Sequence, residues 1–499
     1  MLAERTLGAA LRARAALRPG HTALVCGGVE QSYVELDRES DRVARCLRAG
    51  ERVAFLGKES PHYYELLFGC SRAGAVLVPI NWRLTGAEVA HIVADSGATV
   101  LFADRGCAKA VEQVPDTPVV WLDGFEGWKA GAPDGAPVES GPDDPVAQLY
   151  TSGTTGLPKG VVLGQRGFFA VRASLAEAGL DWLDWRADDV SLVGVPGFHI
   201  GGLWWAVQGL TSGITNVIMP AFASGEAVRL VGEHGVTITC VVPAMLRLML
   251  DEPEAARLRG LRKIVYGGSP ISEALLSRCL DVVGCELAQI YGLTETGNTA
   301  VCLPPSEHVP GGARMRAAGR PYPGVELEVR DSSGHPVPVG EVGEVWLRSP
   351  ANMLEYWGNP AATAESLVDG WVRTGDAGHV DDEGFVFLRD RVKDMIIVAG
   401  ENVYPAEIEG ALAGHPAIAD SAVIGVPDER WGEAVHAFVV LKEKATAREL
   451  MTFLKGTLAA FKLPLRYEFV ETIPRNPSGK ILRRVLREQF WRDRDRQVN

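Results

Sequence analysis

The sequence predicts an α/β fold in which a large N-terminal domain of βαβ subdomains carries a small β-barrel-like unit and precedes a smaller α+β domain. Strand-like apolar runs alternate with helical patterns up to about Leu303, as parallel βαβ units require. After Gly319 the pattern changes to short alternating strands separated by turns, which is typical of a small β-rich unit. The length of 499 residues also exceeds what one hydrophobic core supports.

The first βαβ unit is predicted from local patterns alone. Arg52–Leu56 and Ala75–Ile80 are apolar runs of strand length, and Pro61–Ala73 between them has helical spacing. A Pro-, Gly- and Asp-rich stretch, Ala130–Pro145, indicates a loop between structured blocks. The next apolar run, Val146–Tyr150, is expected to be a buried strand.

Later elements continue this alternation and then end it. Val236–Val242 and Lys263–Tyr266 are expected to extend the parallel arrangement. Three short strands are expected in the β-rich unit: Val325–Arg330, Gly343–Leu347 and Phe385–Leu388. A domain boundary is expected near Asp390, where strands and helices resume in a separate block.

Composition excludes several classes of protein. The formal net charge of −13 argues against broad binding to a nucleic-acid backbone, which needs clustered lysines and arginines. Eight cysteines, scattered from Cys26 to Cys302 without a C-x-x-C pair, are interpreted as buried and reduced. Val190–Gly225 lacks charged residues, but Pro196 and Pro220 interrupt it, so no stable membrane insertion is expected. No secretory signal is visible, and the predicted location is cytoplasmic.

The loop that follows the predicted strand Val146–Tyr150 contains three glycines, four hydroxyl side chains and a lysine. Glycines allow backbone N–H groups to surround an anion, hydroxyls donate to phosphate oxygens, and the lysine adds positive charge. The order of residues is not that of a Walker loop, and a flexible Ser/Gly linker is the alternative. The candidate phosphate-binding residues are Thr151, Ser152, Gly153, Thr154, Thr155, Gly156 and Lys159.

Together with the motifs described below, this loop resembles the adenylate-forming superfamily of acyl-CoA synthetases, firefly luciferases and peptide-synthetase adenylation domains. The resemblance covers nearly the whole chain, because the motifs follow one another in the family's order. It implies that the loop holds the triphosphate of ATP. It also implies an N-terminal adenylation domain at residues 1–389 that binds ATP and the acyl substrate, a hinge at 390–393, and a mobile C-terminal domain at 394–499.

Tyr291–Thr296 resembles the family's adenylate motif. The resemblance implies that Tyr291 stacks on adenine beside Gly292 and that Thr294 contacts the α-phosphate as a catalytic residue. Glu295 is the candidate Mg²⁺ ligand, because magnesium prefers hard oxygen ligands and bridges phosphates. The alternative for this motif is the start of a helix with a capping hydroxyl.

Two further motifs complete the predicted nucleotide site. Tyr266–Pro270 resembles the turn whose backbone lines the adenine and the acyl group, through Gly267 and Gly268. Trp371–Asp376 resembles the motif whose aspartate accepts hydrogen bonds from both ribose hydroxyls. An ionised carboxylate is an acceptor only, so Asp376 suits a vicinal diol.

The C-terminal motifs supply the mobile part of the predicted enzyme. The resemblance implies that Arg391 reaches the ribose, that Lys393 is the pivot of the hinge, and that Gly400 borders the pantetheine channel. Lys480 resembles the lysine that drives adenylation. A cation at that position stabilises the negative charge that builds on the α-phosphate oxygens, so Lys480 is the main catalytic candidate.

Phe198–Gly202 aligns with the acyl-pocket motif, in which amino-acid-activating relatives carry an aspartate where this chain has His199. An imidazole does not replace that carboxylate, so an α-amino acid is not expected as substrate; the alternative is a core histidine. Acetate-specific relatives close the pocket with a tryptophan where this chain has Gly292, and malonate-activating relatives carry an arginine where it has Ile290. The resemblance therefore implies an open, apolar pocket for a hydrophobic monocarboxylate larger than acetate. The candidate pocket residues are His199, Ile200, Gly201, Trp204, Ile290 and Gly292, with His199 also a catalytic candidate.

The leading functional prediction is an AMP-forming acyl-CoA ligase that uses ATP, Mg²⁺ and coenzyme A. The first alternative is transfer of the adenylate to a carrier-protein phosphopantetheine thiol. A luciferase-type oxygenase is a distant third alternative. A non-catalytic binding relative is also a distant alternative, because Lys159, Glu295, Asp376 and Lys480 are all present. The predicted partners are a small carboxylic acid, ATP and coenzyme A, without nucleic acid. The sequence gives no basis for an oligomeric state.

Overall fold

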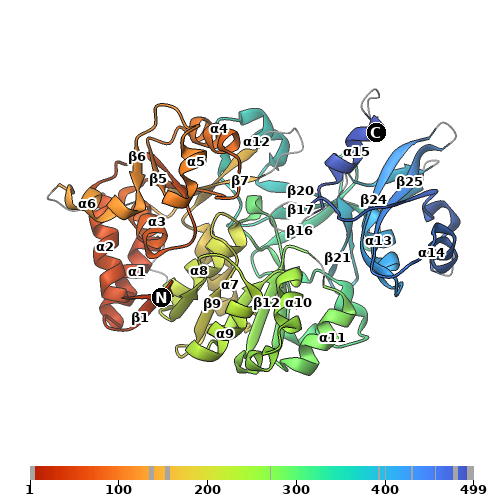
Figure 1. Ribbon diagram of the computed structural model, residues 1–499, viewed down its shortest axis with the longest axis horizontal. Helices are drawn as coiled ribbons and strands as arrows, with labels where there is room; N and C mark the ends of the chain where they lie inside the picture. Colours follow the sequence, from red (N-terminus) through yellow and green to blue (C-terminus); the bar gives the residue numbers. More distant parts are fainter. Residues whose placement is uncertain are drawn as a thin grey trace. The chain divides into compact units, whose positions relative to one another are not determined.

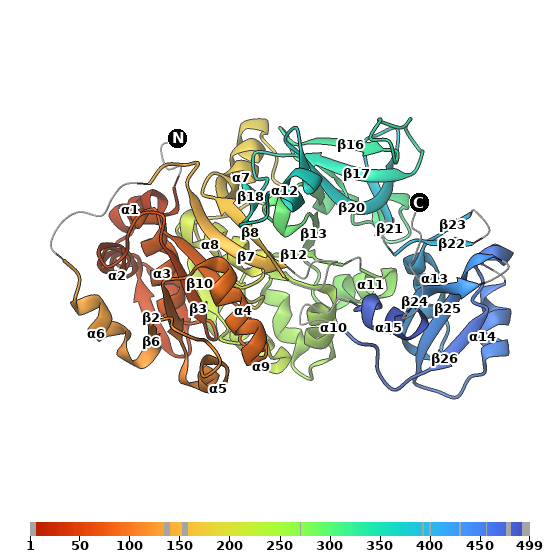
Figure 2. The same ribbon diagram turned by 90° about the horizontal axis from the view of Figure 1, so that it is seen from above.

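The computed structural model describes residues 6–133, 140–151, 158–269, 271–391, 394–398, 401–428, 431–455, 457–475 and 481–491, and it confirms the predicted α/β class (Figures 1 and 2). At positions 390, 391, 402 and 432 it describes the backbone alone. None of the helices in these ranges is long and apolar enough to cross a bilayer. Contacts divide the chain into two compact units, Met1–Leu327 with Leu347–Arg373 and Glu328–Trp346 with Thr374–Asn499.

A nine-stranded sheet forms one layer of the first unit. Its order is β15-β14-β13-β12-β11-β9-β10-β1-β2, and the strands from β13 to β1 run parallel. The predicted strands near 236 and 263 are confirmed as β11 and β12. The bounds are β1 Thr22–Cys26, β2 Val29–Ser32, β9 Val190–Val193, β10 Thr215–Ile218, β11 Ile238–Val241, β12 Lys263–Gly267, β13 Glu286–Tyr291, β14 Val301–Leu303 and β15 Arg320–Pro321.

A seven-stranded sheet forms a second layer, in the order β18-β8-β7-β4-β3-β5-β6. The hairpin β7–β8 is antiparallel, whereas β7, β4, β3, β5 and β6 run parallel. The first predicted strand is confirmed to the residue as β3. The bounds are β3 Arg52–Leu56, β4 Val76–Ile80, β5 Val100–Ala103, β6 Val119–Trp121, β7 Pro145–Thr151, β8 Lys159–Gly164 and β18 Glu355–Tyr356.

Local chemistry explains where the predicted helix of the first unit begins and ends. The helix α3 has the predicted bounds; Pro61 occupies its first turn, and Gly74, at φ +66°, ends it in the left-handed region that glycine adopts easily. The bounds are α1 Leu7–Leu17, α2 Tyr33–Arg45, α3 Pro61–Ala73, α4 Gly86–Ser96, α5 Ala108–Val111, α6 Phe125–Ala130, α7 Gly167–Ala178, α8 Ile200–Ser212, α9 Ser224–His234, α10 Pro243–Asp251, α11 Glu273–Val282 and α12 Pro360–Ser366.

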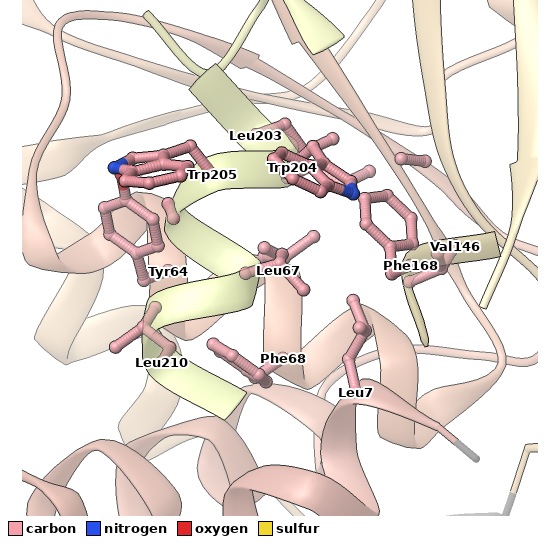
Figure 3. Close-up of a cluster of buried hydrophobic side chains, with 14 of the residues drawn as sticks. Leu7, Tyr64, Leu67, Phe68, Val146, Phe168, Leu203, Trp204, Trp205 and Leu210 are labelled. Carbon is pink, nitrogen blue, oxygen red and sulfur yellow. The ribbon is translucent and has the colours of Figure 1, made fainter. Parts of the chain in front are cut away.

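The main hydrophobic core combines side chains from both sheets with side chains from α3 and α8. Figure 3 shows Leu67 and Phe68 of α3 near Trp204 and Trp205 of α8 in this core. Helices α9, α10 and α11 cover the other face of the nine-stranded sheet, and α4 covers the other face of the seven-stranded sheet. The side chains of α8, which lies in the uncharged stretch, are therefore part of the protein core.

The remaining strands form two smaller sheets, each of five strands. The first contains the three predicted short strands, as β16 Glu326–Arg330, β17 Gly343–Arg348 and β21 Val386–Arg391, together with two strands that were not predicted, β19 Leu367–Val368 and β20 Trp371–Val380. The second contains β22 Ile396–Val398, β23 Glu401–Val403, β24 Ile418–Asp428, β25 Gly432–Leu441 and β26 Arg466–Phe469, with α13 Pro405–Ala413, α14 Ala447–Leu454 and α15 Arg483–Trp491. The predicted hinge at 390–393 lies inside the second compact unit, which begins its C-terminal part at Thr374, and its role stays a prediction.

Candidate active site

Several predicted site residues lie at one edge of the nine-stranded sheet. The parallel strands β9, β12 and β13 end at Val193, Gly267 and Tyr291. Because the carboxyl ends of parallel strands lie at the same edge, the loops that follow them are brought together there. Those loops contain His199, Gly268, and the residues from Gly292 to Glu295. The sheet topology thus brings the predicted adenine, phosphate and acyl residues of the first unit to one edge.

The two glycines of the adenine turn are required for different reasons, close packing at Gly267 and a positive φ at Gly268. Gly267 pairs with Ile290 in the parallel ladder. A Cβ atom on Gly267 would lie 2.7 Å from the carbonyl oxygen of Ile290, which is too close for any side chain. Gly268 has φ +80°, a conformation that favours glycine. Strand β12 can therefore end beside β13 with its backbone exposed at the edge, as a ligand-binding turn needs.

The predicted adenylate motif forms a tight turn after β13. Thr294–Thr296 is a short 3₁₀ helix, and the N–H of Leu293 donates to Oγ1 of Thr296 at 2.8 Å. The turn ends at Gly297, whose φ is +67°. The hydroxyl that caps this turn is therefore that of Thr296, and this hydrogen bond does not use the side chain of Thr294.

Tyr356 joins two predicted parts of the site, and the sequence analysis missed it. Its hydroxyl donates to Oε1 of Glu295 at 2.7 Å. The Nζ of Lys159 lies 4.9 Å from the centroid of the Tyr356 ring, within the range of a cation–π interaction. Tyr356 belongs to β18 and pairs with Val161 of β8, two residues after Lys159. No local pattern marks a tyrosine in such a short strand, so only the pairing reveals this connection.

The carboxylate of Glu295 is suited to magnesium. Mg²⁺ usually binds one or two protein carboxylates and completes its coordination with water and substrate phosphates. Among the described residues, one cluster of three side chains has metal-ligating geometry, and it does not include Glu295: His62, Glu65 and Glu126. There Nζ of Lys129 lies 2.7 Å from Oε2 of Glu65 and 2.6 Å from Oε1 of Glu126. The lysine is therefore the cation of that cluster, and Glu295 remains the candidate ligand.

Of the predicted phosphate loop, the structure describes the two ends. Thr151 ends β7 and Lys159 begins β8, and these two residues pair with each other across the hairpin. Ser152, Gly153, Thr154, Thr155 and Gly156 lie outside the described residues. The loop therefore connects two paired strands, and its role as a phosphate-binding loop stays a prediction.

His199 precedes the first residue of α8, and its environment keeps the imidazole neutral. Burial, together with the charge of Arg83, lowers the pKa of His199 to about 4. Its Nε2 is buried and has no hydrogen-bond partner within the described part of the chain. Its ring lies 4.6 Å from that of Phe198, centroid to centroid. This nitrogen is available to a ligand, and the assignment of His199 to the acyl site stays a prediction.

Asn298 lies beside the start of α8 and was also missed by sequence reasoning. A Cβ atom on Gly201 would lie 3.6 Å from Oδ1 of Asn298. Asn298 has φ +92°, a conformation that non-glycine residues seldom adopt. Its Nδ2 is buried without a hydrogen-bond partner among the residues described. Backbone strain of this kind is concentrated at functional sites.

Three other predicted pocket residues are closely packed. A Cβ atom on Gly292 would lie 2.5 Å from the carbonyl oxygen of Asn298, so a larger side chain there would displace backbone. Trp204 and Ile290 are buried in the main core, with exposed fractions of 2% and 6%. The assignment of these residues, and of Ile200, to the acyl pocket stays a prediction.

The ribose residues belong to adjacent strands of the second unit. Asp376 of β20 pairs with Arg391 of β21 in the antiparallel ladder. Asp376 is 9% exposed, and its N–H donates to Oγ1 of Thr374 at 3.0 Å. Gly375, at φ +68°, turns the strand immediately before it. The side chain of Arg391 and the residues Lys393, Gly400 and Lys480 lie outside what the structure describes.

The chain matches two families and several characterised proteins over nearly its full length. Residues 11–357 match the family described as AMP-binding enzyme, and residues 407–480 match the AMP-binding enzyme C-terminal domain. The fatty acid–[acyl-carrier-protein] ligase ScoC of Streptomyces coeruleorubidus is 59% identical over 496 residues, which cover 96% of each chain. The long-chain-fatty-acid–CoA ligase FadD13 of Mycobacterium tuberculosis is 37% identical over 505 residues, or 97% of this chain and 99% of FadD13.

A solved structure shares the architecture. The o-succinylbenzoate coenzyme A synthetase MenE of Bacillus subtilis, in complex with ATP and magnesium ion, superimposes with a TM-score of 0.85. It is 31% identical in sequence, and the match covers 95% of this chain and 98% of MenE.

Proposed function

The chain belongs to the AMP-binding enzyme family of the adenylate-forming superfamily, and from this premise we propose that it activates a fatty acid with ATP and transfers the acyl group to the phosphopantetheine thiol of an acyl carrier protein. The observation that carries the choice of acceptor is the 59% identity to ScoC across 96% of both chains. This reverses the order of the two acceptors predicted from sequence alone, in which coenzyme A came first. Activation of the acid is common to both acceptors.

The proposed reaction has two half-reactions. In the first, a carboxylate oxygen of the fatty acid attacks the α-phosphorus of ATP, and pyrophosphate leaves. In the second, the thiol loses its proton, its sulfur attacks the acyl carbonyl, and AMP leaves with the electron pair of the broken C–O bond. Lys480 stabilises the negative charge that develops in the first half-reaction, and Asp376 holds the ribose in both.

The phosphate side of the site is supported by the contact between Lys159, Tyr356 and Glu295. Lys159 adds positive charge next to the predicted triphosphate loop, and Glu295 would hold Mg²⁺. The ion, when bound, neutralises phosphate charge and orients the leaving pyrophosphate. Tyr356 restrains the carboxylate by a hydrogen bond to Oε1, so this ligand is positioned before ATP binds.

The acid side of the site supports an uncharged, largely apolar acyl chain. With a pKa lowered to about 4, His199 is neutral at physiological pH and offers neither a carboxylate nor a fixed positive charge. Helix α8, which follows it, carries no acidic or basic side chain. These features favour a fatty acid over an amino acid or a dicarboxylate.

The test compares acceptors and acids with one purified enzyme. Pyrophosphate release is measured over straight-chain acids from octanoate to hexadecanoate, and thioester products are identified by mass spectrometry. Acceptors are a holo acyl carrier protein, the same protein without its phosphopantetheine arm, and coenzyme A. We expect acyl transfer to the holo carrier protein and none to the apo form.

A second acceptor remains a specific candidate, because FadD13, a CoA ligase, is 37% identical over nearly the whole chain. If kcat/KM for coenzyme A exceeds that for the holo carrier protein, the CoA ligase function replaces the proposed one. Failure of every acid to release pyrophosphate would refute the activation step itself.

A further inference from the structure

A buried glutamate outside the predicted site holds the backbone that leads into α8. The N–H of Gly197 donates to Oε1 of Glu59 at 2.7 Å. The carbonyl oxygen of Gly197 accepts a hydrogen bond from the hydroxyl of Tyr63 at 2.9 Å. Both polar groups of one residue are thus bound by side chains from the loop after β3 and the start of α3. The backbone at Gly197 is fixed from two directions.

The contact is too close to accommodate a side chain at position 197. A Cβ atom on Gly197 would lie 2.6 Å from the hydroxyl oxygen of Tyr63 and 2.9 Å from Oε1 of Glu59. Gly197 is itself buried. The glycine therefore allows the two side chains to reach the main chain directly, with no space between them.

The fixed backbone continues into the predicted acyl site within two residues. The N–H of His199 donates to the carbonyl oxygen of Pro196 at 3.0 Å. The carbonyl of His199 accepts the first hydrogen bonds of α8, from the N–H groups of Gly202 and Leu203. A displacement of Gly197 would thus move both the imidazole of His199 and the first turn of α8.

Glu59 is held in place by its other contacts. The hydroxyl of Tyr64 donates to Oε2 at 2.8 Å, and the N–H of Glu59 donates to the carbonyl oxygen of Pro220 at 3.3 Å. The thiol of Cys26, in β1, donates to the carbonyl oxygen of Glu59. Each carboxylate oxygen accepts one hydrogen bond, and no ion pair to Glu59 is found in the described ranges. An ionised carboxylate only accepts hydrogen bonds, so it suits the two donors that face it, the N–H of Gly197 and the hydroxyl of Tyr64.

We propose that Glu59 is a positioning residue for the acyl site, because its ionised carboxylate holds Gly197 and thereby sets the position of His199 and of the start of α8. This inference rests on the proposed function in one respect, the use of His199 and α8 by the acyl substrate. Glu59 itself touches no reacting atom. It acts through the backbone between β9 and α8.

The protonation of Glu59 changes in the neutral range. Burial raises the pKa of Glu59 to about 7, although the hydrogen bonds from Gly197 and Tyr64 act in the opposite direction. The titratable groups that face it are Tyr63 and Tyr64 of α3 and Cys26 of β1, and burial raises the pKa of each of these above its usual value. Only Glu59 among them changes charge between pH 6 and 8. Protonation converts one acceptor oxygen into a donor and weakens the hold on the loop.

The experiment compares Glu59→Ala and Glu59→Gln with the wild type in the full-length enzyme. Pyrophosphate release is measured with the straight-chain acids from octanoate to hexadecanoate as probes. We expect Glu59→Ala to lower kcat/KM for the acid by about tenfold, since it leaves two buried donors without a partner, while KM for ATP changes by less than about twofold. Gln offers one acceptor and one donor, as protonated Glu59 does, so we expect Glu59→Gln to show at every pH the lowered kcat/KM that the wild type shows below pH 7.

The pH profile separates positioning from a merely structural role. In the wild type, kcat/KM for the acid should fall as the pH drops through about 7, where Glu59 becomes protonated. In Glu59→Gln this step should be absent. Because the pKa of Glu59 is raised on folding, its contribution to stability is full below pH ~4.5 and is lost as the pH rises through about 7. The Gln variant should therefore gain relative stability at pH 8, which thermal melting detects.

A matched control is Glu65→Gln, another buried glutamate of the same region. Glu65 binds Lys129 and Gln31, and within the described residues it makes no hydrogen bond or ion pair to the loop from Gly194 to His199. It should alter thermal stability without changing the pH profile. The inference is overturned if Glu59→Gln retains the wild-type step near pH 7, or if Glu59→Ala and Glu65→Gln change kcat/KM for the acid equally. A wild type that releases no pyrophosphate would instead refute the proposed function.

Discussion

Replacing Tyr356 by phenylalanine tests whether the contact with Glu295 prepares the site for magnesium and ATP. The change removes only the hydroxyl, whose oxygen lies 2.7 Å from Oε1 of Glu295. The aromatic ring stays, so the interaction with Lys159 at 4.9 Å is kept. Tyr356 is 6% exposed, so water has little access to replace the lost donor.

The magnitude follows from the kind of hydrogen bond that is lost. Hydrogen bonds to charged groups contribute ~1.5–3 kcal/mol, and 1.4 kcal/mol corresponds to about a factor of ten. When Mg²⁺ binds, the ion still holds Glu295, so we expect a loss near the lower limit of this range, about 1.5 kcal/mol. We expect kcat/KM for ATP in pyrophosphate release to fall by about tenfold and the Mg²⁺ concentration for half-maximal rate to rise.

The assay measures pyrophosphate release at varied ATP and Mg²⁺ with a saturating fatty acid. Tyr322→Phe is the matched control, since its buried hydroxyl lies 3.0 Å from the hydroxyl of Thr299 and not beside Glu295. An unchanged Mg²⁺ dependence in Tyr356→Phe, or an equal change in both variants, would show that the hydroxyl does not prepare Glu295 for the ion.

Three further predictions concern other parts of the molecule. Lys480→Ala should abolish pyrophosphate release but spare acyl transfer from supplied acyl-adenylate, because its charge is needed only while the α-phosphate is attacked; loss of both half-reactions would contradict this. Lys393→Pro should lower thioester formation at least about tenfold while adenylate formation survives, since proline fixes φ near −65° at the predicted pivot, and equal loss of both with intact circular dichroism would exclude a hinge there. Lys129→Ala should destabilise the fold by about 3–5 kcal/mol in chemical denaturation, because Lys129 pairs with Glu39 and Glu65 in the core. Burial raises the pKa of Glu39, but hydrogen bonds from Lys129 and Arg38 outweigh it and lower the pKa to about 2. The wild type should therefore lose stability as the pH falls from ~4.5 through about 2. If the stability of Lys129→Ala depends on acid pH in the same way as that of the wild type, this reasoning is refuted.

The choice between the two thiol acceptors was not determined by the motifs of the chain. The motifs that the sequence analysis used describe activation of the acid, which both classes of enzyme share. The likeness to ScoC, a carrier-protein ligase, is spread over 96% of the chain and not confined to any motif. A direct comparison of acceptors is therefore the measurement with the greatest consequence for the function.

The sequence by itself determined those features that depend on neighbouring residues. The bounds of β3 and α3 agree with the prediction because apolar periodicity, a proline in the first turn and a glycine after the last are all local signals. The grouping of the loops after β9, β12 and β13 at one edge of the nine-stranded sheet also follows once these strands are parallel, because their carboxyl ends lie at the same edge. The motif residues in those loops needed no three-dimensional information to be found.

Only the tertiary structure decided which distant side chains hold those loops. Glu59 binds Gly197 across 138 residues of sequence, and Tyr356 binds Glu295 across 61. Asn298 likewise acquires its unusual φ and its place beside α8 from packing that no local pattern encodes. A hydrogen bond needs two groups within about 3 Å, and a linear pattern contains no distances between remote residues. Candidate residues for the chemistry can therefore be proposed from sequence, whereas the side chains that hold their loops become visible only when the chain is folded.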